Sequence, residues 1–188
     1  MKSQKSGTNI ILTALFAALI SASCFIQIPL PVGIPIIIQD MMCMLSGMLL
    51  GSFYGALSVV IFLILGSLGL PVFSGKGGIQ HLISGPTGGF LFSYAIGALA
   101  GGLILAIFLS NKKEHSKIKS LIVISLAAIA ATVIIFAGGI LGFMRVTQSG
   151  LEKTTVLFPF IPGNIIKIIL MVPLTYKFRP VIFRYTHS

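Results

Sequence analysis

The chain has 188 residues, of which 56% are hydrophobic and 9% are charged, with three acidic residues against thirteen lysines and arginines. So few polar side chains cannot cover the surface of a soluble globule, and the composition therefore excludes a soluble protein and indicates an integral membrane protein.

The net charge of +10 would suit nucleic-acid binding, but the positions of the charges favour another explanation. Nine of the thirteen basic residues fall before the first apolar run, in one central gap and after the last apolar run: Lys2, Lys5, Lys112, Lys113, Lys117, Lys119, Lys177, Arg179 and Arg184. With an even number of spans these three segments lie on one side, which the positive-inside rule makes the cytoplasm. We therefore expect contact with anionic membrane lipid and no nucleic-acid partner.

Six apolar segments are long enough for membrane helices, since a bilayer core needs about 20 apolar residues and fewer where neighbouring helices shield a span. We expect them at residues 8–27, 36–50, 52–68, 88–109, 121–143 and 161–176. The first run continues past the length of a signal peptide without a cleavage site, so we interpret it as a span. The predicted fold class is an all-α membrane protein, a compact six-helix bundle forming a single domain over residues 1–188, with both termini cytoplasmic.

The connections between these spans carry their own signals. Gly51 alone separates the second span from the third, which predicts a tight antiparallel hairpin. Glycines and prolines between residues 66 and 89 cannot extend a helix, so we expect a structured, non-helical loop of roughly twenty residues between the third and fourth spans. Pro29, Pro31 and Pro35 predict an extended first connection. Together with residues 145–159, these connections would converge at the external end, which suggests a ligand site that opens outward.

Small residues recur every four positions on several predicted helices. The rows are Ala14, Ala18 and Ala22; Gly47, Gly51 and Gly55; Gly97 and Gly101; and Gly138 and Gly142. Rows of this kind allow two helix backbones to approach closely in lipid. For the glycine rows we expect packing within the bundle.

Lys167 is the first candidate for a binding residue. At a rise of about 1.5 Å per residue from Pro162, its Cα lies about 7 to 8 Å inside the last span, where an ionisable group is costly. Asn164 lies on the same helix face, three residues earlier. An ammonium and an amide suit a compact polar head such as a cyclic urea or a carboxylate. The alternative is that Lys167 extends to the outer interface and Asn164 caps the helix.

Further candidates fall at the same predicted end. Gln39 and Asp40 begin the second span and could either bind a ligand or cap their helix. Aromatic side chains could wall an apolar pocket or simply pack, and they are Phe73, Phe90 and Tyr94. The segment 85–89 could offer backbone shape and amides at the start of the fourth span, where a helix N-terminus favours an anionic group, through Gly85, Thr87 and Gly88. Lys76 is a polar group on the otherwise apolar loop.

Sequence signals for catalysis and metal binding are missing. The segment around Lys76 does not match a phosphate-binding loop, because Leu70 stands at the expected first glycine and Gly77 replaces the required Ser or Thr. Cys24 and Cys43 lie in apolar sequence without metal-ligand spacing, so we expect them to pack. We predict no catalytic residue, metal or cofactor, and any ATP hydrolysis must occur on another polypeptide.

The sequence GLPVFSGKGG at 69–78, followed by GPTGG at 85–89, resembles the BioY family, the biotin-binding S components of energy-coupling-factor (ECF) transporters. The resemblance extends from about residue 28 to 167. It implies capture of biotin at a bacterial cell membrane, with a transmembrane coupling subunit and two ATPase subunits as partners. It also implies that the row Ala14, Ala18 and Ala22 docks the coupling subunit, with internal packing as the alternative. Two other functions stay open, an S component for another small vitamin and a non-transporting membrane scaffold.

One position departs from the family pattern. That pattern reads Pro-Gly-Asp, two residues, Lys near the last helix, where its acid and lysine belong to the biotin site, whereas this chain has Asn164 in place of the acid. Lys167 therefore lacks its nearest counter-charge. Asp40, Glu152 or a carboxylate of the ligand could take that role.

Overall fold

The computed structural model describes residues 2–28, 36–109, 116–148, 150 and 159–187. In these ranges the helices are α1 (Lys2–Ser23), α2 (Gln39–Leu50), α3 (Ser52–Ser67), α4 (Ile79–Ser84), α5 (Gly88–Phe108), α6 (Lys117–Thr147) and α7 (Phe160–His187). Two short strands, β1 (Gln27–Ile28) and β2 (Ile36–Ile37), pair antiparallel with Gln27 opposite Ile37.

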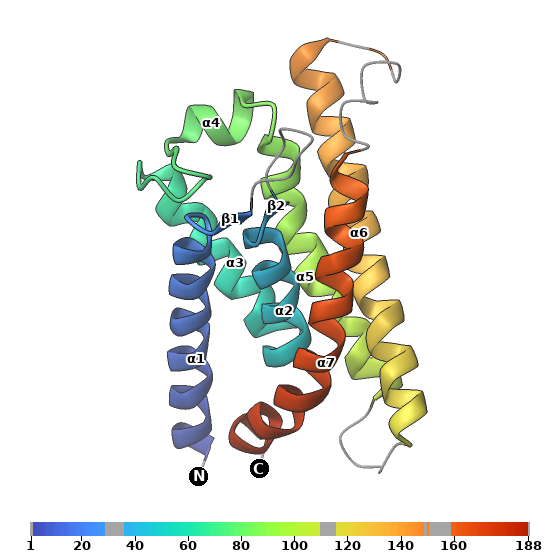
Figure 1. Ribbon diagram of the computed structural model, residues 1–188. Coiled ribbons are helices and arrows are strands. Elements are labelled where there is room, and N and C mark those ends of the chain that lie inside the picture. Colours follow the sequence, from blue (N-terminus) through green and yellow to red (C-terminus); the bar gives the residue numbers. More distant parts are fainter. Residues whose placement is uncertain (1, 29–35, 110–115, 149, 151–158, 188) are drawn as a thin grey trace.

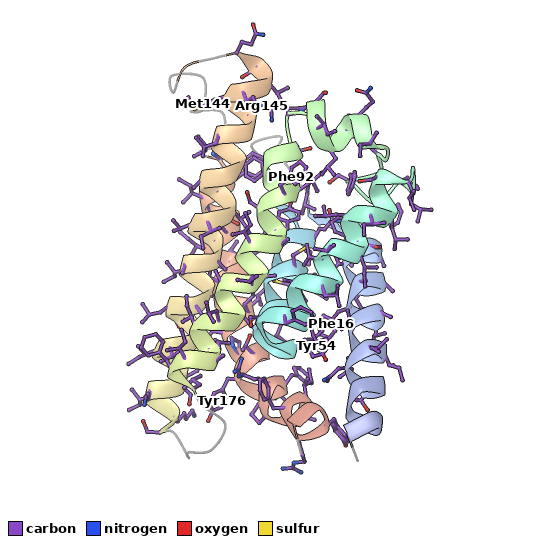
Figure 2. The ribbon with its side chains drawn as sticks, turned by 180° about the vertical axis from the view of Figure 1, so that it is seen from behind. Phe16, Tyr54, Phe92, Met144, Arg145 and Tyr176 are labelled. Carbon is purple, nitrogen blue, oxygen red and sulfur yellow. The ribbon has the colours of Figure 1, made fainter. Side chains whose placement is uncertain are left out.

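Six long helices stand side by side in one bundle, and the short α4 lies across one end of it (Figure 1). We call this the lid end, and the opposite end, where both termini lie, the basic end. Figure 2 shows Arg145 at the lid end and Tyr54 and Tyr176 toward the basic end. The starts of α1 and α6 and the last turns of α7 carry basic residues, so the described members of all three basic segments share one end.

Each of the six predicted spans contains a helix, and the tight α2–α3 hairpin is confirmed. Gly51 alone separates the two helices and has φ +88°, a value that favours glycine. Its conformation lets the chain reverse without a longer loop.

Several predicted boundaries are wrong. The loop of residues 66–89 is not purely irregular, because Ile79–Ser84, a stretch without glycine or proline, forms α4. Gln27 and Ile36, expected in the first two spans, lie instead in the strands β1 and β2, where Gln27 pairs with Ile37 and Ile36 with Ile28. This pairing satisfies backbone groups that cannot continue a helix beside the prolines. Arg145, expected in a loop, lies in the last turn of α6. The proline connection 29–35 and Glu152 lie outside the described residues.

The outer surface of the bundle is apolar. Two helices, α5 with 21 residues and α6 with 31, are long and apolar enough to cross a membrane by themselves, and α3 and the Gly7–Ser23 part of α1 are shorter apolar helices. Large hydrophobic side chains such as Ile10, Phe53 and Phe92 are more than half exposed. Such continuous apolar exposure fits a lipid environment.

Glycines place helix backbones in direct contact inside the bundle. A side chain on Gly89 of α5 would collide with the backbone of Gly138 and Gly142 on α6. A side chain on Gly47 of α2 would collide with the carbonyl of Ala98 on α5. The expectation that the glycine rows serve internal packing is confirmed at these contacts, where the absence of a side chain lets α5 approach α6 and α2 closely.

At the basic end, α7 contacts the last turn of α2. The buried Arg179 donates from Nη1 to the Met48 carbonyl oxygen at 2.7 Å, and its guanidinium lies 4.4 Å from the ring centre of Phe183. A cation at a helix C-terminus satisfies an unpaired carbonyl and interacts favourably with the negative end of the helix dipole. Arg179 therefore fixes the end of α2 against α7.

The glycine contacts predict that substitution by alanine destabilises the fold at a crowded glycine but not at an open one. We expect Gly47→Ala to lower stability by about 1–3 kcal/mol, because the added methyl group collides with the Ala98 backbone and overpacks the interface. The control is Gly7→Ala, where nothing lies within 4 Å of the added atom and helix propensity improves. Thermal unfolding in detergent measures both, and equal melting temperatures for the two variants would contradict this packing.

Candidate functional site

A cavity of about 300 Å³ lies beneath the lid end. It is lined by Ile37, Gln39, Asp40, Phe73, Ser74, Pro86, Thr87, Phe90, Leu91, Tyr94, Phe136, Phe143, Phe160, Asn164 and Lys167. Small-molecule sites typically measure about 300–1,000 Å³ and combine apolar walls with a few polar groups. The cavity has this character and lies at the small end of the range.

The polar wall of the cavity is an ion pair between α2 and α7. Lys167 Nζ lies 2.8 Å from Asp40 Oδ1 and 2.7 Å from Oδ2, and the two side chains are 8% and 13% exposed. Asp40 sits in the first turn of α2, where the helix dipole favours a carboxylate, and its Oδ1 also accepts from Met41 N at 2.8 Å. Lys167 therefore does not extend to the interface, and Asp40 supplies its counter-charge.

Asn164 lies one helical turn before Lys167 on α7. Its Nδ2 donates to the Phe160 carbonyl oxygen at 2.8 Å, so Asn164 acts inside the first turn of the helix and is not its cap. Its Oδ1 is buried and has no hydrogen-bond partner among the residues that the structure describes. Since nearly all buried acceptors in proteins are paired, this oxygen is a candidate acceptor for a donor from outside the described residues, such as a ligand in the cavity.

Gln39 holds the glycine-rich loop over the cavity to the bundle. Its Nε2 donates to the Ile20 carbonyl oxygen of α1 at 3.2 Å and to the Val72 carbonyl oxygen of the loop at 2.8 Å. Both hydrogens of the amide nitrogen are thereby used on the protein. Gln39 lines the cavity as expected, but its donor group connects three parts of the fold.

Phe73 fixes the glycine-rich loop over the cavity. Its ring is 1% exposed and packs edge-on against Phe62 with centroids 5.5 Å apart, in a space that any side chain at Gly66 would fill. Phe73 and Lys76 exchange backbone hydrogen bonds of 2.8 and 3.0 Å around Ser74 and Gly75, which both have positive φ. This tight turn has the type I′ geometry and leaves the Lys76 side chain exposed, away from the cavity lining.

The segment 85–89 contributes shape more than amides. Gly85 N donates to the His81 carbonyl oxygen and Gly88 N to the Gly85 carbonyl oxygen, so both amides are already engaged within the loop. Side chains at Gly85 and Gly88 would collide with the carbonyl oxygens of His81 and Leu82. Thr87 lines the cavity, whereas Gly85 and Gly88 do not, so these two positions do not offer the free amides that we expected.

Aromatic rings form the apolar walls. Phe90 and Tyr94 line the cavity as expected, and Phe90 packs edge-on against Phe136 of α6 at 5.7 Å. The sequence analysis missed Phe136 and Phe143, although their seven-residue spacing on one helix puts them on the same face. It also missed the lining residues Ile37, Ser74, Pro86, Leu91 and Phe160.

The alanine row of α1 lies on the outer surface of the bundle. Ala14, Ala18 and Ala22 are all exposed, whereas the intervening Ala17 is 2% exposed and faces the core. Packing inside this chain therefore does not account for the row.

A helical bundle with an apolar outer surface, a largely apolar cavity, a buried ion pair and a buried acceptor without a partner in the described residues is typical of membrane proteins that bind small molecules. The chain belongs to the BioY family, whose sequence model matches residues 1–184.

Known relatives share most of this length. A biotin transporter of Rhodobacter capsulatus is 37% identical over 177 residues, covering 86% of this chain and 88% of the relative. One from Rhizobium etli is 35% identical over 169 residues, covering 88% and 89%. The crystal structure of an S-component for biotin from an ECF-type ABC transporter superposes with a TM-score of 0.79 and 29% identity, covering 95% of this chain and 94% of that one.

The lid carries a titratable group with a predictable pH effect. The His81 ring stacks on Phe73 with centroids 6.1 Å apart, and its Nε2 lies 3.2 Å from Thr87 Oγ1. Partial burial and then the charge of Lys76 lower the pKa of His81. The folded chain therefore binds the second proton of the His81 ring less tightly than the unfolded chain does. The contribution of the neutral ring to the stability of the fold is complete above about pH 6.5 and is lost as the pH falls through the lowered pKa.

We therefore expect the melting temperature to fall between about pH 7 and pH 5, and His81→Gln to remove part of that fall. Thermal unfolding of both proteins across this range measures the difference. Identical pH profiles would exclude a contribution of His81 to lid stability.

Proposed function

We propose that this chain is the substrate-binding S component of an ECF-type ABC transporter, that it captures biotin in the cavity at the lid end, and that it is not an enzyme. The observation that carries this function is the buried Asp40–Lys167 pair beside Asn164 Oδ1, which has no partner within the described residues, in a largely apolar cavity. The family relatives named for biotin transport support the choice of ligand. No cofactor is required, since biotin is the transported ligand.

In this function the chain crosses a bacterial cell membrane six times, through α1, α2, α3, α5, α6 and α7. The lid end faces outward, and both termini lie in the cytoplasm. Support comes from the basic residues, whose described members gather at the end of the bundle where the termini lie. The exposed members of this group, Lys117, Lys119, Lys177 and Arg184, contact anionic lipid headgroups of the inner leaflet, whereas the buried Arg179 does not.

Biotin matches the cavity in size and in polarity. Its bicyclic head is compact and apolar except for a ureido group, whose N–H can donate to Asn164 Oδ1. The rings of Phe90, Tyr94 and Phe136 provide the apolar slot, and Phe73 closes it from the loop. Gln39, Thr87 and Lys167 supply the remaining polar positions in the lining.

Energy for release comes from partner proteins, a transmembrane coupling subunit and two ATPase subunits. The exposed row of Ala14, Ala18 and Ala22 on α1 offers a smooth surface for a coupling helix, because small residues allow close backbone approach in lipid. An S component for another small vitamin is the second candidate, favoured by the amide at position 164 where the family pattern has an acid.

The proposed ligand is tested by calorimetry with the purified protein. We expect biotin to bind, and Lys167→Ala to weaken binding at least about tenfold, because the variant leaves the buried Asp40 without its partner. Lys177→Ala on the exposed part of the same helix is the matched control and should bind as the unmodified protein does. Unchanged affinity in Lys167→Ala would remove this residue from the site, and binding of a different vitamin would favour the second candidate.

The docking surface predicts a variant that binds without transporting. We expect Ala18→Trp to retain biotin affinity but to lose most uptake of labelled biotin by cells that also make the coupling and ATPase subunits, because the ring blocks close helix approach. Ile129→Trp, at an exposed position of α6, is the control for a bulky lipid-facing residue. Equal uptake by the two variants would argue against docking through α1.

A further inference from the structure

The acid of the site stands on α2 instead of α7, and this changes which ligand head the cavity accepts. We infer that the placement of the carboxylate at Asp40 and of the amide at Asn164 makes the protein select an uncharged N–H donor and reject a cationic head. The inference rests on the proposed function and specifies the chemistry of its ligand.

The Asp40 carboxylate is neutralised by Lys167 and most of its acceptor sites are occupied by the protein. Both of its oxygens accept from Lys167 Nζ, at 2.8 and 2.7 Å, and Oδ1 accepts also from Met41 N. The side chain is 13% exposed and lies in the first turn of its helix. A carboxylate held in this way offers little negative charge to a ligand, since the adjacent ammonium neutralises it.

Asn164 offers a single kind of contact. Its Nδ2 is committed to the Phe160 carbonyl oxygen, so the group left for a ligand is Oδ1, a neutral acceptor. A neutral N–H satisfies this oxygen without bringing charge into the cavity. A cationic donor would instead enter an apolar cavity within one helical turn of the Lys167 ammonium and without a free carboxylate to pair with it.

A carboxylate at position 164 would reverse this preference. It would lie three residues before Lys167 on the same helix, close enough to neutralise the ammonium and still accept from a ligand. Hydrogen bonds to a charged acceptor are roughly twice as strong as neutral ones, and a cationic donor gains most from the change. The identities of residues 40 and 164 are therefore coupled, and exchanging them should change selectivity while preserving the total charge of the site.

The experiment compares biotin with 2-iminobiotin, in which a guanidine replaces the urea and is protonated at neutral pH. Calorimetry at pH 7 gives the ratio of the two dissociation constants for the unmodified protein and for the exchanged variant Asp40→Asn/Asn164→Asp. We expect the unmodified protein to prefer biotin, and the exchange to reduce that preference at least about tenfold. Because the ratio compares two ligands within one protein, a uniform loss of affinity in the variant does not affect it.

The two single variants show whether the exchange preserves the ion pair. In thermal unfolding without ligand, we expect Asp40→Asn to lower the melting temperature. The exchanged variant should recover part of that loss, because the carboxylate at position 164 then neutralises Lys167, although the hydrogen bond from Asn164 to the Phe160 carbonyl oxygen is lost. Asn164→Asp alone places two carboxylates around one ammonium and should also lower the melting temperature.

The outcomes separate this inference from the proposed function. Binding of biotin with an unchanged ligand ratio in a folded exchanged variant overturns the inference and leaves the proposed function intact. Failure of the exchanged variant to recover melting temperature overturns the coupling of the two positions. Absence of biotin binding by the unmodified protein overturns both.

Discussion

The site depends on one buried ion pair, between Asp40 and Lys167. A lysine ammonium inside an apolar bundle is tolerated because a carboxylate lies within 2.8 Å, and removing either partner would leave the other uncompensated. The pair joins α2 to α7 at the lid end, while Arg179 joins the same two helices at the basic end through the Met48 carbonyl oxygen. The two helices run in the same direction and are held together at both ends, which fixes the cavity wall between them.

The packing around this pair explains why the cavity can persist under a loop. Glycines bring α2, α5 and α6 into backbone contact, and the Phe73 ring enters the space that Gly66 leaves free. The loop is thereby anchored by an apolar side chain at its middle, and its polar groups are satisfied locally by a tight turn. The loop over the cavity is therefore held by apolar packing of Phe73 and by hydrogen bonds such as that from Gln39 to Val72.

Much of this arrangement could be predicted from the sequence, because the apolar segments and glycine spacing specify helices and their close contacts. Lys167 could also be identified from its position in the last apolar segment, because an ionisable group inside a membrane span is costly and is usually functional. The partner of Lys167 could not be assigned, because Asp40 is 127 residues away and pairing across that distance depends on how α2 and α7 pack. The helix α4 was missed for a related reason, since its six residues are too few to show apolar periodicity among flanking glycines.

The double contact of Gln39 has a mechanical consequence. One amide nitrogen holds both the last turns of α1, through Ile20, and the cover of the cavity, through Val72. The end of α1 at the lid end and the glycine-rich loop therefore cannot move apart without breaking a hydrogen bond to this nitrogen. Cys24, directly after α1, adds a second link, because its Sγ lies 3.8 Å from the Pro71 carbonyl oxygen, so the end of α1 and the loop are fastened together as one unit.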